Sequence, residues 1–247
     1  MHLMFGLGPG QAPDAGSSPA SKLSAVLAAA RCTSVYGPAI LRSGYSFAQL
    51  SPIGIHEYLE HRDRFRNPTA APAKPRVERG TPGTLCGSLD ELLRLAARVG
   101  TGAAAPPATA RRVTIRTPLG QRLASESARD SLWRAFELPV FEELTGSEGD
   151  VFAAECEAHS GLHLATESAI FEAWYGELVV TSLDAIRYPI LRLRTGWVGA
   201  LDHCACPCGE RVTRFLPVLP TAAPARKPPT AARTPRRRAD DTAVVAV

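Results

Sequence analysis

The spacing of apolar residues predicts one well-formed helix near the middle of the chain. Residues 88–100 carry apolar side chains at helical spacing, namely Leu89, Leu92, Leu93, Ala96 and Val99. Ser88 and Glu91 have the spacing of a capping box, in which each residue bonds the backbone N–H of the other. Gly100 is a typical end for such a run. We therefore expect a capped amphipathic helix over residues 88–100.

Two further segments have a helical pattern. Ser125 can cap a helix that runs through Leu132 to Phe136 and ends before Leu138-Pro139, because the residue before proline disfavours helical geometry. Upstream, residues 55–65 alternate charged residues with apolar ones in the manner of a short amphipathic helix.

Strand patterns dominate the second half of the chain. A first strand is expected at residues 113–115, and another ends at Cys156. From Val140 onward, short β-branched or alternating runs are separated by Gly, Ser, Asp or Pro, at residues 140–144, 162–166, 169–174, 176–183 and 189–194. Helices followed by several strands predict an α/β fold that runs into a β-rich subdomain.

Low-complexity segments divide the chain. Residues 1–30 are rich in Ala, Gly, Ser and Pro, and residues 67–84 hold four prolines. These segments predict a poorly ordered N-terminus over 1–30, a helical and linker region over 31–110, a core over 111–215 and a disordered tail rich in Pro and Arg over 216–247.

The charge of the chain is concentrated in this tail. Residues 225–241 hold six Lys or Arg against two Asp, an excess of 6 − 2 = +4 that equals the net charge of the whole chain. The rest is about neutral, so nucleic-acid binding is not expected. No apolar run is long enough for a membrane span, and the start has no basic region of a secretory signal. These features predict a cytoplasmic protein.

Cysteines are clustered rather than spread. Half of the six lie in the stretch "DHCACPCG", residues 202–209, and "ECEAHSGLH", residues 155–163, adds Cys156, His159 and His163. In a reducing compartment clustered thiols bind metal more often than they form disulfides. A turn joining Cys156 to His163, with a C-x-C pair, would supply four N/S ligands for tetrahedral Zn²⁺. Reduced thiols on a loop are the alternative.

Residues 110–215 resemble a known enzyme family. The run "LWRAFELPVFEELTGSEGDVFAAECEAHSGLHL", then "GELVVTSL", "YPILRLRTG" and "CPCG", is similar to the phenylacetate-coenzyme A ligases, which are adenylate-forming enzymes. The resemblance implies a fragment of the adenylate-forming N-terminal domain. It also implies ATP and Mg²⁺ as cofactors, and a carboxylic acid and coenzyme A as partners.

The resemblance assigns roles to two motifs. At residues 144–148 it implies catalytic roles for Ser147 and Glu148, which would contact phosphate and Mg²⁺, and a nucleotide contact at Leu144 and Gly146. At the second motif it implies that the nucleotide lies against Arg194, Thr195 and Trp197.

The chain departs from the family in ways that matter chemically. Trp197 stands where the family has an Asp that accepts hydrogen bonds from ribose, and an indole has no acceptor. Residues 67–84 are Pro-rich where the family has a Ser/Thr/Gly-rich phosphate loop, and Pro/Arg-rich sequence follows "CPCG" where the family continues into a domain with a catalytic Lys. We expect a truncated ligase with weak or no activity alone, which would need a second copy or a complementing chain. The alternative is a non-catalytic zinc-stabilised module.

The resemblance also selects the metal ligands. "GLH" and "CPCG" are the matching elements, which favours Cys156, His163, Cys206 and Cys208 for a structural Zn²⁺. Cys204, His159 and His203 are then reserve ligands. A catalytic zinc, with Glu155 or Glu157 as a base, would need an open position on the metal.

Overall fold

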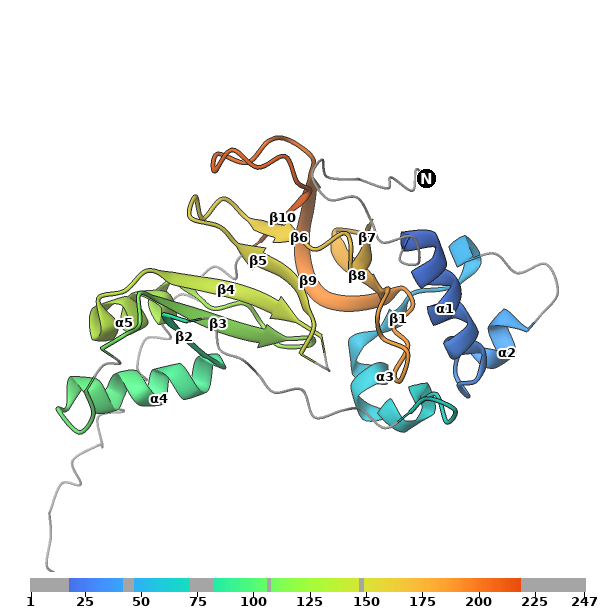
Figure 1. Ribbon diagram of the computed structural model, residues 1–247, viewed down its shortest axis with the longest axis horizontal. Coiled ribbons are helices and arrows are strands. Elements are labelled where there is room, and N and C mark those ends of the chain that lie inside the picture. Colours follow the sequence, from blue (N-terminus) through green and yellow to red (C-terminus); the bar gives the residue numbers. More distant parts are fainter. Residues whose placement is uncertain (1–17, 42–46, 72–81, 106–107, 147–148, 219–247) are drawn as a thin grey trace, which may run out of the picture.

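The described residues form a mixed α/β fold in which a large sheet has helices at both ends (Figure 1). The computed structural model describes residues 18–41, 47–71, 82–105, 108–146 and 149–218. The helices are α1 (Pro19–Arg31), α2 (Gly37–Ile40), α3 (Ile55–Glu60), α4 (Leu89–Gly100) and α5 (Glu126–Phe136), with 3-10 turns η1 (Phe47–Gln49) and η2 (Arg62–Phe65). The strands are β1 (Ile53–Gly54), β2 (Thr84–Gly87), β3 (Arg112–Pro118), β4 (Val140–Thr145), β5 (Val151–Glu155), β6 (Leu162–Leu164), β7 (Ala169–Trp174), β8 (Glu177–Ser182), β9 (Leu193–Asp202) and β10 (Arg214–Pro217). The α/β fold expected from the sequence is confirmed.

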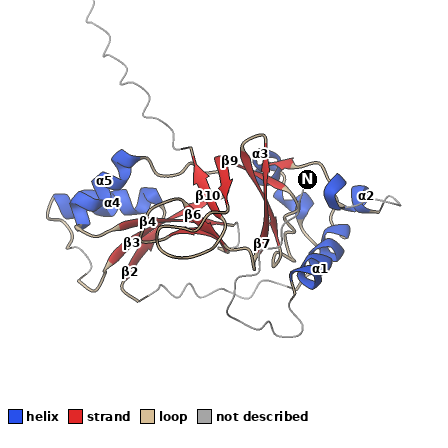
Figure 2. Cartoon of the chain, turned by 90° about the horizontal axis from the view of Figure 1, so that it is seen from above, coloured by secondary structure: helices blue, strands red, loops and turns tan. Residues whose placement is uncertain are grey.

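One end of the sheet is a parallel unit made of β2, α4, β3, α5 and β4. The three strands run parallel, and α4 and α5 pack against each other on one side of them (Figures 1 and 2). Helix α4 begins at Ser88 with the predicted capping box and ends at Gly100. Its apolar stripe and that of α5 meet the inward residues of the strands in one cluster, whose buried members are Leu92, Ala96, Val113, Ile115, Ala124, Leu132, Phe136 and Val140.

The rest of the sheet is antiparallel apart from β1, and its order is not the order of the sequence. From β4 the order continues β5, β6, β10, β9, β8 and β7, and β1 pairs with β9. Strand β9 is long enough to serve two neighbours, because its first half pairs with β8 and its second half with β10. We call β5, β6, β10, the end of β9 and the connecting loops 156–161 and 203–213 the metal junction.

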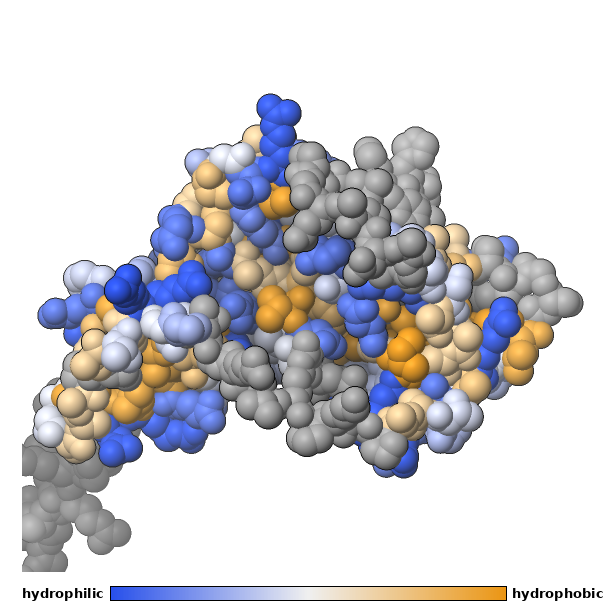
Figure 3. All heavy atoms as spheres, in the orientation of Figure 1, coloured by the Kyte–Doolittle hydropathy of each residue, from blue (hydrophilic) through white to orange (hydrophobic). Residues whose placement is uncertain are grey.

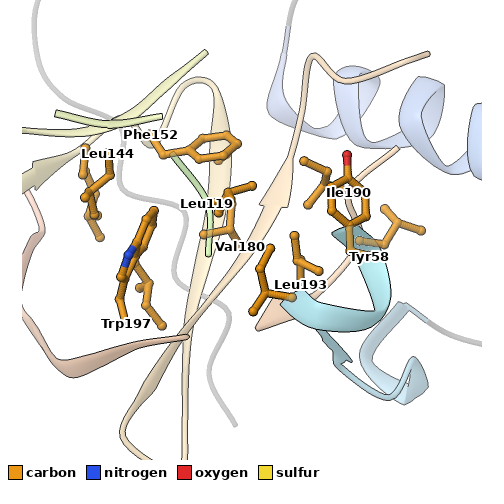
Figure 4. Packing of buried hydrophobic residues seen from close by; sticks show 14 of the residues in the cluster. Tyr58, Leu119, Leu144, Phe152, Val180, Ile190, Leu193 and Trp197 are labelled. Atoms are coloured by element: carbon orange, nitrogen blue, oxygen red, sulfur yellow. The ribbon is translucent and has the colours of Figure 1, made fainter. Parts of the chain in front are cut away.

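A second apolar core lies beneath the middle of the sheet. Figure 4 shows Trp197, Leu144, Phe152 and Leu119 in one group, and Tyr58 beside Ile190 and Leu193 in another. Helices α1 and α3 add buried residues such as Val26 and Tyr58 to the same cluster. The face drawn in Figure 3 shows hydrophobic residues near the middle of the molecule and strongly hydrophilic ones along its upper edge.

The structure differs from the sequence-based expectations at the N-terminal side. Residues 19–31 form α1, inside the segment for which composition predicted poor order. Ser18 caps this helix, and the small residues Ala29 and Ala30 allow it to pack closely. The sheet also crosses the domain boundary predicted at residues 110/111, since β2 pairs with β3.

Two strands near the end of the chain were also predicted incompletely. The strand expected at 189–194 begins only at Leu193, because Arg192 has a φ of 47°, which interrupts an extended run. Strand β10 was missed, and it includes residues 216 and 217 of the predicted tail. The remainder of that tail, 219–247, lies outside the described residues.

Within the described ranges, no helix combines the length and the apolar character needed to cross a membrane.

Candidate metal centre

The first half of the centre is the turn between β5 and β6. Cys156 follows β5 directly, and its carbonyl accepts a hydrogen bond of 3.0 Å from the His159 N–H. Gly161 has a φ of 87°, and a Cβ there would lie 2.8 Å from the Phe215 carbonyl oxygen. Only glycine permits this turn and this close approach together. The antiparallel strand β6 then places His163 next to Cys156.

The second half is a tight loop after β9. The backbone N–H of Cys206 donates to the Glu210 carbonyl (2.9 Å), and the Gly209 N–H donates to the Cys206 carbonyl (2.9 Å). Gly209 has a φ of 98°, which closes the loop. These bonds turn the chain back on itself, so that the side chains of Cys206 and Cys208 both face the β5–β6 turn.

Strand β10 joins the two halves. It pairs with β6 on one side and with β9 on the other, so that Arg214 lies opposite both His163 and Asp202. Strand β6 pairs with β5 on its other side, where Ala154 lies opposite His163. Directly opposite residues project from the same face of a sheet, so one row of four side chains crosses the junction. The register therefore brings together segments that are about fifty residues apart.

Four ligand atoms meet at this point. The Sγ atoms of Cys156, Cys206 and Cys208 and one ring nitrogen of His163 all lie within 4.8 Å of one another. The two sulfurs of Cys156 and Cys206 are 3.6 Å apart, and Cys208 Sγ is 3.7 Å from His163 Nε2. In a tetrahedral zinc site the bond lengths require about 3.8 Å between sulfurs and about 3.6 Å between sulfur and nitrogen. These two distances are close to that geometry, and the set as a whole lies within 4.8 Å.

The thiols of the cluster differ in acidity. Burial raises the pKa of Cys206, but hydrogen bonds from the Cys208 N–H and from the side chains of His163, Cys208 and Cys156 lower it to about 6. The pKa of Cys208 is raised, because burial and the neighbouring Cys206 and Cys156 sulfurs outweigh a hydrogen bond from the Glu210 backbone. One thiolate already present at neutral pH is what a first metal–sulfur bond requires.

The reserve ligands lie outside this cluster. His159 stacks on Phe141 with ring centroids 4.8 Å apart, and His203 Nδ1 is 3.2 Å from Thr213 Oγ1. Cys204 is exposed, and its N–H donates to Asp202 Oδ1 at 2.9 Å. The structure thus brings together the four residues chosen from the sequence and leaves the three reserves apart.

Three of the residues that the sequence predicted to contact a nucleotide are buried. Leu144 and Thr195 are fully buried, and Thr195 Oγ1 donates to the Leu178 carbonyl (2.8 Å). Trp197 is 4% exposed, and its Nε1–H donates to the Gln121 carbonyl (2.8 Å). Leu144 and Trp197 belong to the central apolar cluster (Figure 4), so their side chains face the core. Contact of these residues with a nucleotide stays a prediction from the family resemblance.

The other predicted residues have separate positions. Arg194 is half-exposed and pairs with Glu177, with Nη2 at 2.6 Å from a carboxylate oxygen. Gly146 lies beside the ring of Phe152, 3.0 Å from where a Cβ would stand. Ser147 and Glu148, the predicted catalytic pair, lie outside the described residues.

A cavity of about 640 Å³ opens at the carboxyl ends of the parallel strands. Gly87, Pro118 and Thr145, the last residues of β2, β3 and β4, all line it. Ser88 and Glu91 at the start of α4 and Arg116 of β3 add polar and charged groups of both signs to its wall. The carboxyl edge of parallel strands is the usual location of ligand crevices in α/β sheets.

Sequence reasoning missed the charged groups around the metal ligands. Arg214 is 5% exposed, and it forms an ion pair with Asp202. Burial alone would lower the pKa of Arg214, but hydrogen bonds and charge interactions with Asp202 and with Cys206 raise it. A lone Arg after a Cys-rich loop carries no pattern in the sequence, because its partners are set by strand register.

A second buried network lies between the parallel unit and the metal junction. Arg129 of α5 donates to Glu142 and to Glu155, both at 2.8 Å. Glu142 is only 1% exposed and also accepts from the hydroxyl of Thr117 and the N–H of Ala124. Because Glu155 precedes Cys156, the network connects α5 to the start of the metal-bearing turn.

Comparisons with known proteins give a partial likeness to one ligase. No family model and no curated protein matches the chain. Among solved structures, it is similar to an open conformation of 2-hydroxyisobutyryl-CoA ligase in complex with 2-HIB-AMP and CoA, with 17% identity and a TM-score of 0.46 over 54% of this chain and 32% of that chain. The same ligase in its postadenylation state with 2-HIB-AMP gives 18% identity and a TM-score of 0.45 over 54% and 31%. The chain spans about a third of the length of these ligase chains.

Proposed function

We propose that the Cys156–His163–Cys206–Cys208 cluster binds one zinc ion, and that the chain is a zinc-stabilised module. The observation that carries the proposal is the convergence of four ligand atoms within 4.8 Å of one another, from two segments that β10 joins. Three thiolates and an imidazole are a ligand set that favours zinc over the oxygen-seeking Mg²⁺ and Ca²⁺.

The role of this zinc is structural. Four protein ligands fill a tetrahedral shell, so no position remains for a reactive water. The metal instead links the β5–β6 turn to the loop after β9, and its binding free energy adds to folding. The zinc would act on the face of the junction that carries His163 and Arg214, while Phe152, Leu162 and Phe215 of the same strands pack into the central core.

A complete adenylation reaction by this chain alone is less well supported. The residue at the ribose position, Trp197, has its only polar hydrogen committed to the Gln121 carbonyl and has no acceptor for a ribose hydroxyl. Its side chain packs in the same core cluster as Leu144 and Phe152 (Figure 4). A module that resembles a ligase domain but uses this position for packing fits a non-catalytic role.

Elemental analysis tests the zinc proposal. The purified chain should contain about one zinc per chain, and Cys206→Ser with Cys208→Ser should abolish it. Cys204→Ser is the matched control, because this thiol lies in the same loop but outside the cluster, and it should retain full occupancy. A wild-type chain that is purified with zinc available and contains none contradicts the proposal.

A second candidate function is the binding of a nucleotide or acyl-adenylate, and the cavity at the parallel strand ends favours it. Its volume is in the usual range for small-molecule sites, roughly 300–1,000 Å³. Arg116 supplies a positive group in its wall. In this case the family resemblance implies ATP, Mg²⁺, a carboxylic acid and coenzyme A as ligands, with a second copy or a complementing chain supplying the remaining groups.

Pyrophosphate exchange with ATP and a panel of aryl and short-chain acids tests this second candidate. Exchange above the rate of an Arg116→Gln variant would support it. The absence of both exchange and any thermal shift with ATP would exclude it, while leaving the zinc proposal unaffected.

A further inference from the structure

The row of four side chains that crosses the metal junction contains one ion pair, between Arg214 and Asp202. The row consists of Ala154, His163, Arg214 and Asp202, on β5, β6, β10 and β9. His163 is one of the four ligands, and Arg214 is its direct neighbour across the strand pair. A permanently charged guanidinium thus lies next to the position where the metal would bind.

The contacts of Arg214 reach both halves of the centre. One terminal nitrogen, Nη1, donates to the carbonyl (2.8 Å) and the hydroxyl (2.9 Å) of Ser160, within the turn that joins Cys156 to His163. The other, Nη2, bonds Asp202 Oδ2. The second oxygen of Asp202 accepts from the Cys204 N–H, where the Cys-rich loop begins. One side chain therefore ties the two ligand-bearing segments together.

The remaining donor of Arg214 is not used by these contacts. Its Nε is buried and has no hydrogen-bond partner among the residues that the structure describes. A buried N–H without a partner is costly, and such groups in folded proteins ordinarily have an acceptor. The buried Cys206 belongs to the cluster whose ligand His163 lies directly opposite Arg214, and its charge raises the pKa of Arg214.

The charge of the centre supplies the reason for a cation here. A zinc dication with three thiolates and one neutral imidazole has one negative charge in excess. Of the four ligands only Cys206 is buried, at 3% exposed, so water screens the charge on its sulfur least. A charge on a buried group is unfavourable unless it is paired, and an adjacent cation offsets part of it.

We propose that Arg214 is the organising residue of the metal centre: it links both ligand-bearing segments and shares its positive charge between Asp202 and the thiolates of the cluster. The inference rests on the proposed zinc binding and adds a residue to it that is not itself a ligand. Groups of this kind around metal ligands typically change metal affinity by about ten- to a hundredfold.

The test uses the full chain with zinc and with cobalt(II). Competition with a chromophoric chelator should show that Arg214→Gln lowers zinc affinity by about ten- to a hundredfold. Arg214→Lys keeps the charge but loses the forked contacts to Ser160 and Asp202, so its loss of affinity should be smaller than that of Arg214→Gln and below about tenfold. Arg194→Gln is the matched control, because it removes an Arg–carboxylate pair on β9 away from the cluster, and it should change nothing.

Cobalt(II) supplies an absorption spectrum that a general loss of stability would not change. The thiolate-to-cobalt charge-transfer band of the fully loaded protein should shift to longer wavelength in Arg214→Gln, because a thiolate without a nearby cation gives up its electron more easily. Arg214→Lys should restore part of the shift. If Arg214→Gln does not fold, the test uses Arg214→Lys alone. A loss of tenfold or more in the zinc affinity of this variant would contradict a role for the positive charge of residue 214.

The outcomes separate the two proposals. A wild-type chain that binds no zinc overturns both. A wild-type chain with one zinc, together with an Arg214→Gln variant of unchanged affinity and unchanged cobalt spectrum, overturns only the role of Arg214.

Discussion

The parallel unit and the metal junction are held together by different forces, although they share one sheet. In the parallel unit, the interior between α4, α5 and the strands is a cluster of aliphatic residues with Phe136. In the metal junction, one face of the strands carries a row of an alanine, a histidine, an arginine and an aspartate, while apolar residues of the same strands such as Phe152 and Phe215 join the central core. The parallel unit relies on buried apolar surface, whereas the junction in addition brings together groups that are unfavourable when buried unless they are paired.

This difference determines what each region needs in order to fold. The parallel unit gains stability from every buried methylene, so its stability is spread over many residues. The junction depends on a few contacts that must all be present, because each unpaired group there carries a desolvation cost. We therefore expect changes in the parallel unit to have graded effects and changes at the junction to have all-or-none effects.

The largest expected effect is the loss of the metal. Chelation, or Cys206→Ser with Cys208→Ser, should destabilise the chain by at least about 5 kcal/mol, because zinc binding is coupled to folding of the junction. Hydrogen exchange should show the loss in β6, β10 and the end of β9 first, while the amides of α4 keep most of their protection. Equal loss of protection in both regions would show that they fold as one unit and would remove the distinction.

The next largest effect is expected at Arg129, which connects the two regions. Arg129→Met leaves Glu142 and Glu155 as buried carboxylates without a cation and should cost about 3–5 kcal/mol, measured by urea unfolding. Arg116→Met is the matched control. Its pair with Glu143 is longer, 3.8 Å, and partly exposed, so a loss below about 1 kcal/mol is expected. Equal losses in the two variants would contradict a special role for the Arg129 network.

A graded effect is expected in the core of the parallel unit. Leu132 is fully buried in α5, and Leu132→Ala should cost about 3 kcal/mol from lost burial and the cavity that remains. Its neighbour Trp133 is 57% exposed, so Trp133→Ala should change stability by about 0.5 kcal/mol or less. Both variants should retain their zinc, and zinc loss in Leu132→Ala would show that the core of the parallel unit supports the junction.

The two regions also differ in how far the sequence predicts them. In the parallel unit the decisive residues are close together: the Ser88 cap, the apolar stripe and Gly100 lie within thirteen positions, and the helix forms as expected. At the junction, residue types indicated the ligands, but the partners of Arg214 are 12 and 54 residues away. Strand β10 is four residues long and includes Pro217, too short a run for periodicity to identify.

The burial of Trp197 also depends on structure that local sequence patterns do not show. Motif order placed Trp197 beside a nucleotide, but a large apolar side chain on an inward position of β9 is drawn into the core. Alternation along β9 is visible only once the strand is known to begin at Leu193, after the positive φ of Arg192. Local patterns thus predict elements, and the register between distant strands decides which side chains reach a site.

The smallest effect tests how local the stability of the parallel unit is. Ser88→Ala removes the side chain that accepts from the Glu91 N–H and bonds the Glu91 carboxylate at 2.7 Å, and it should cost about 1 kcal/mol. The hydrogen bonds from the Ser88 side chain and backbone hold the pKa of Glu91 below its ordinary value of 4.5. A depressed carboxyl pKa stabilises the fold above the unfolded pKa and loses this effect as the pH falls through the folded pKa. The difference between wild type and Ser88→Ala should therefore be constant above about pH 5 and narrow as the pH falls below 4.5.

Ser125→Ala provides the control for this pH dependence. Ser125 caps α5 through the Ala128 N–H at 3.3 Å, and an alanine at the third helical position cannot form a capping box. Its loss should cost a similar amount with no change between pH 3.5 and pH 7, roughly the range over which a glutamate titrates. Thermal unfolding at several pH values measures both variants. If the Ser88→Ala difference stays constant down to the acid limit of folding, Glu91 contributes nothing as a charge and the cap acts through its neutral hydrogen bonds alone. The stability of α4 would then depend on Ser88 and the apolar stripe, which would make the parallel unit still less dependent on charge than the junction.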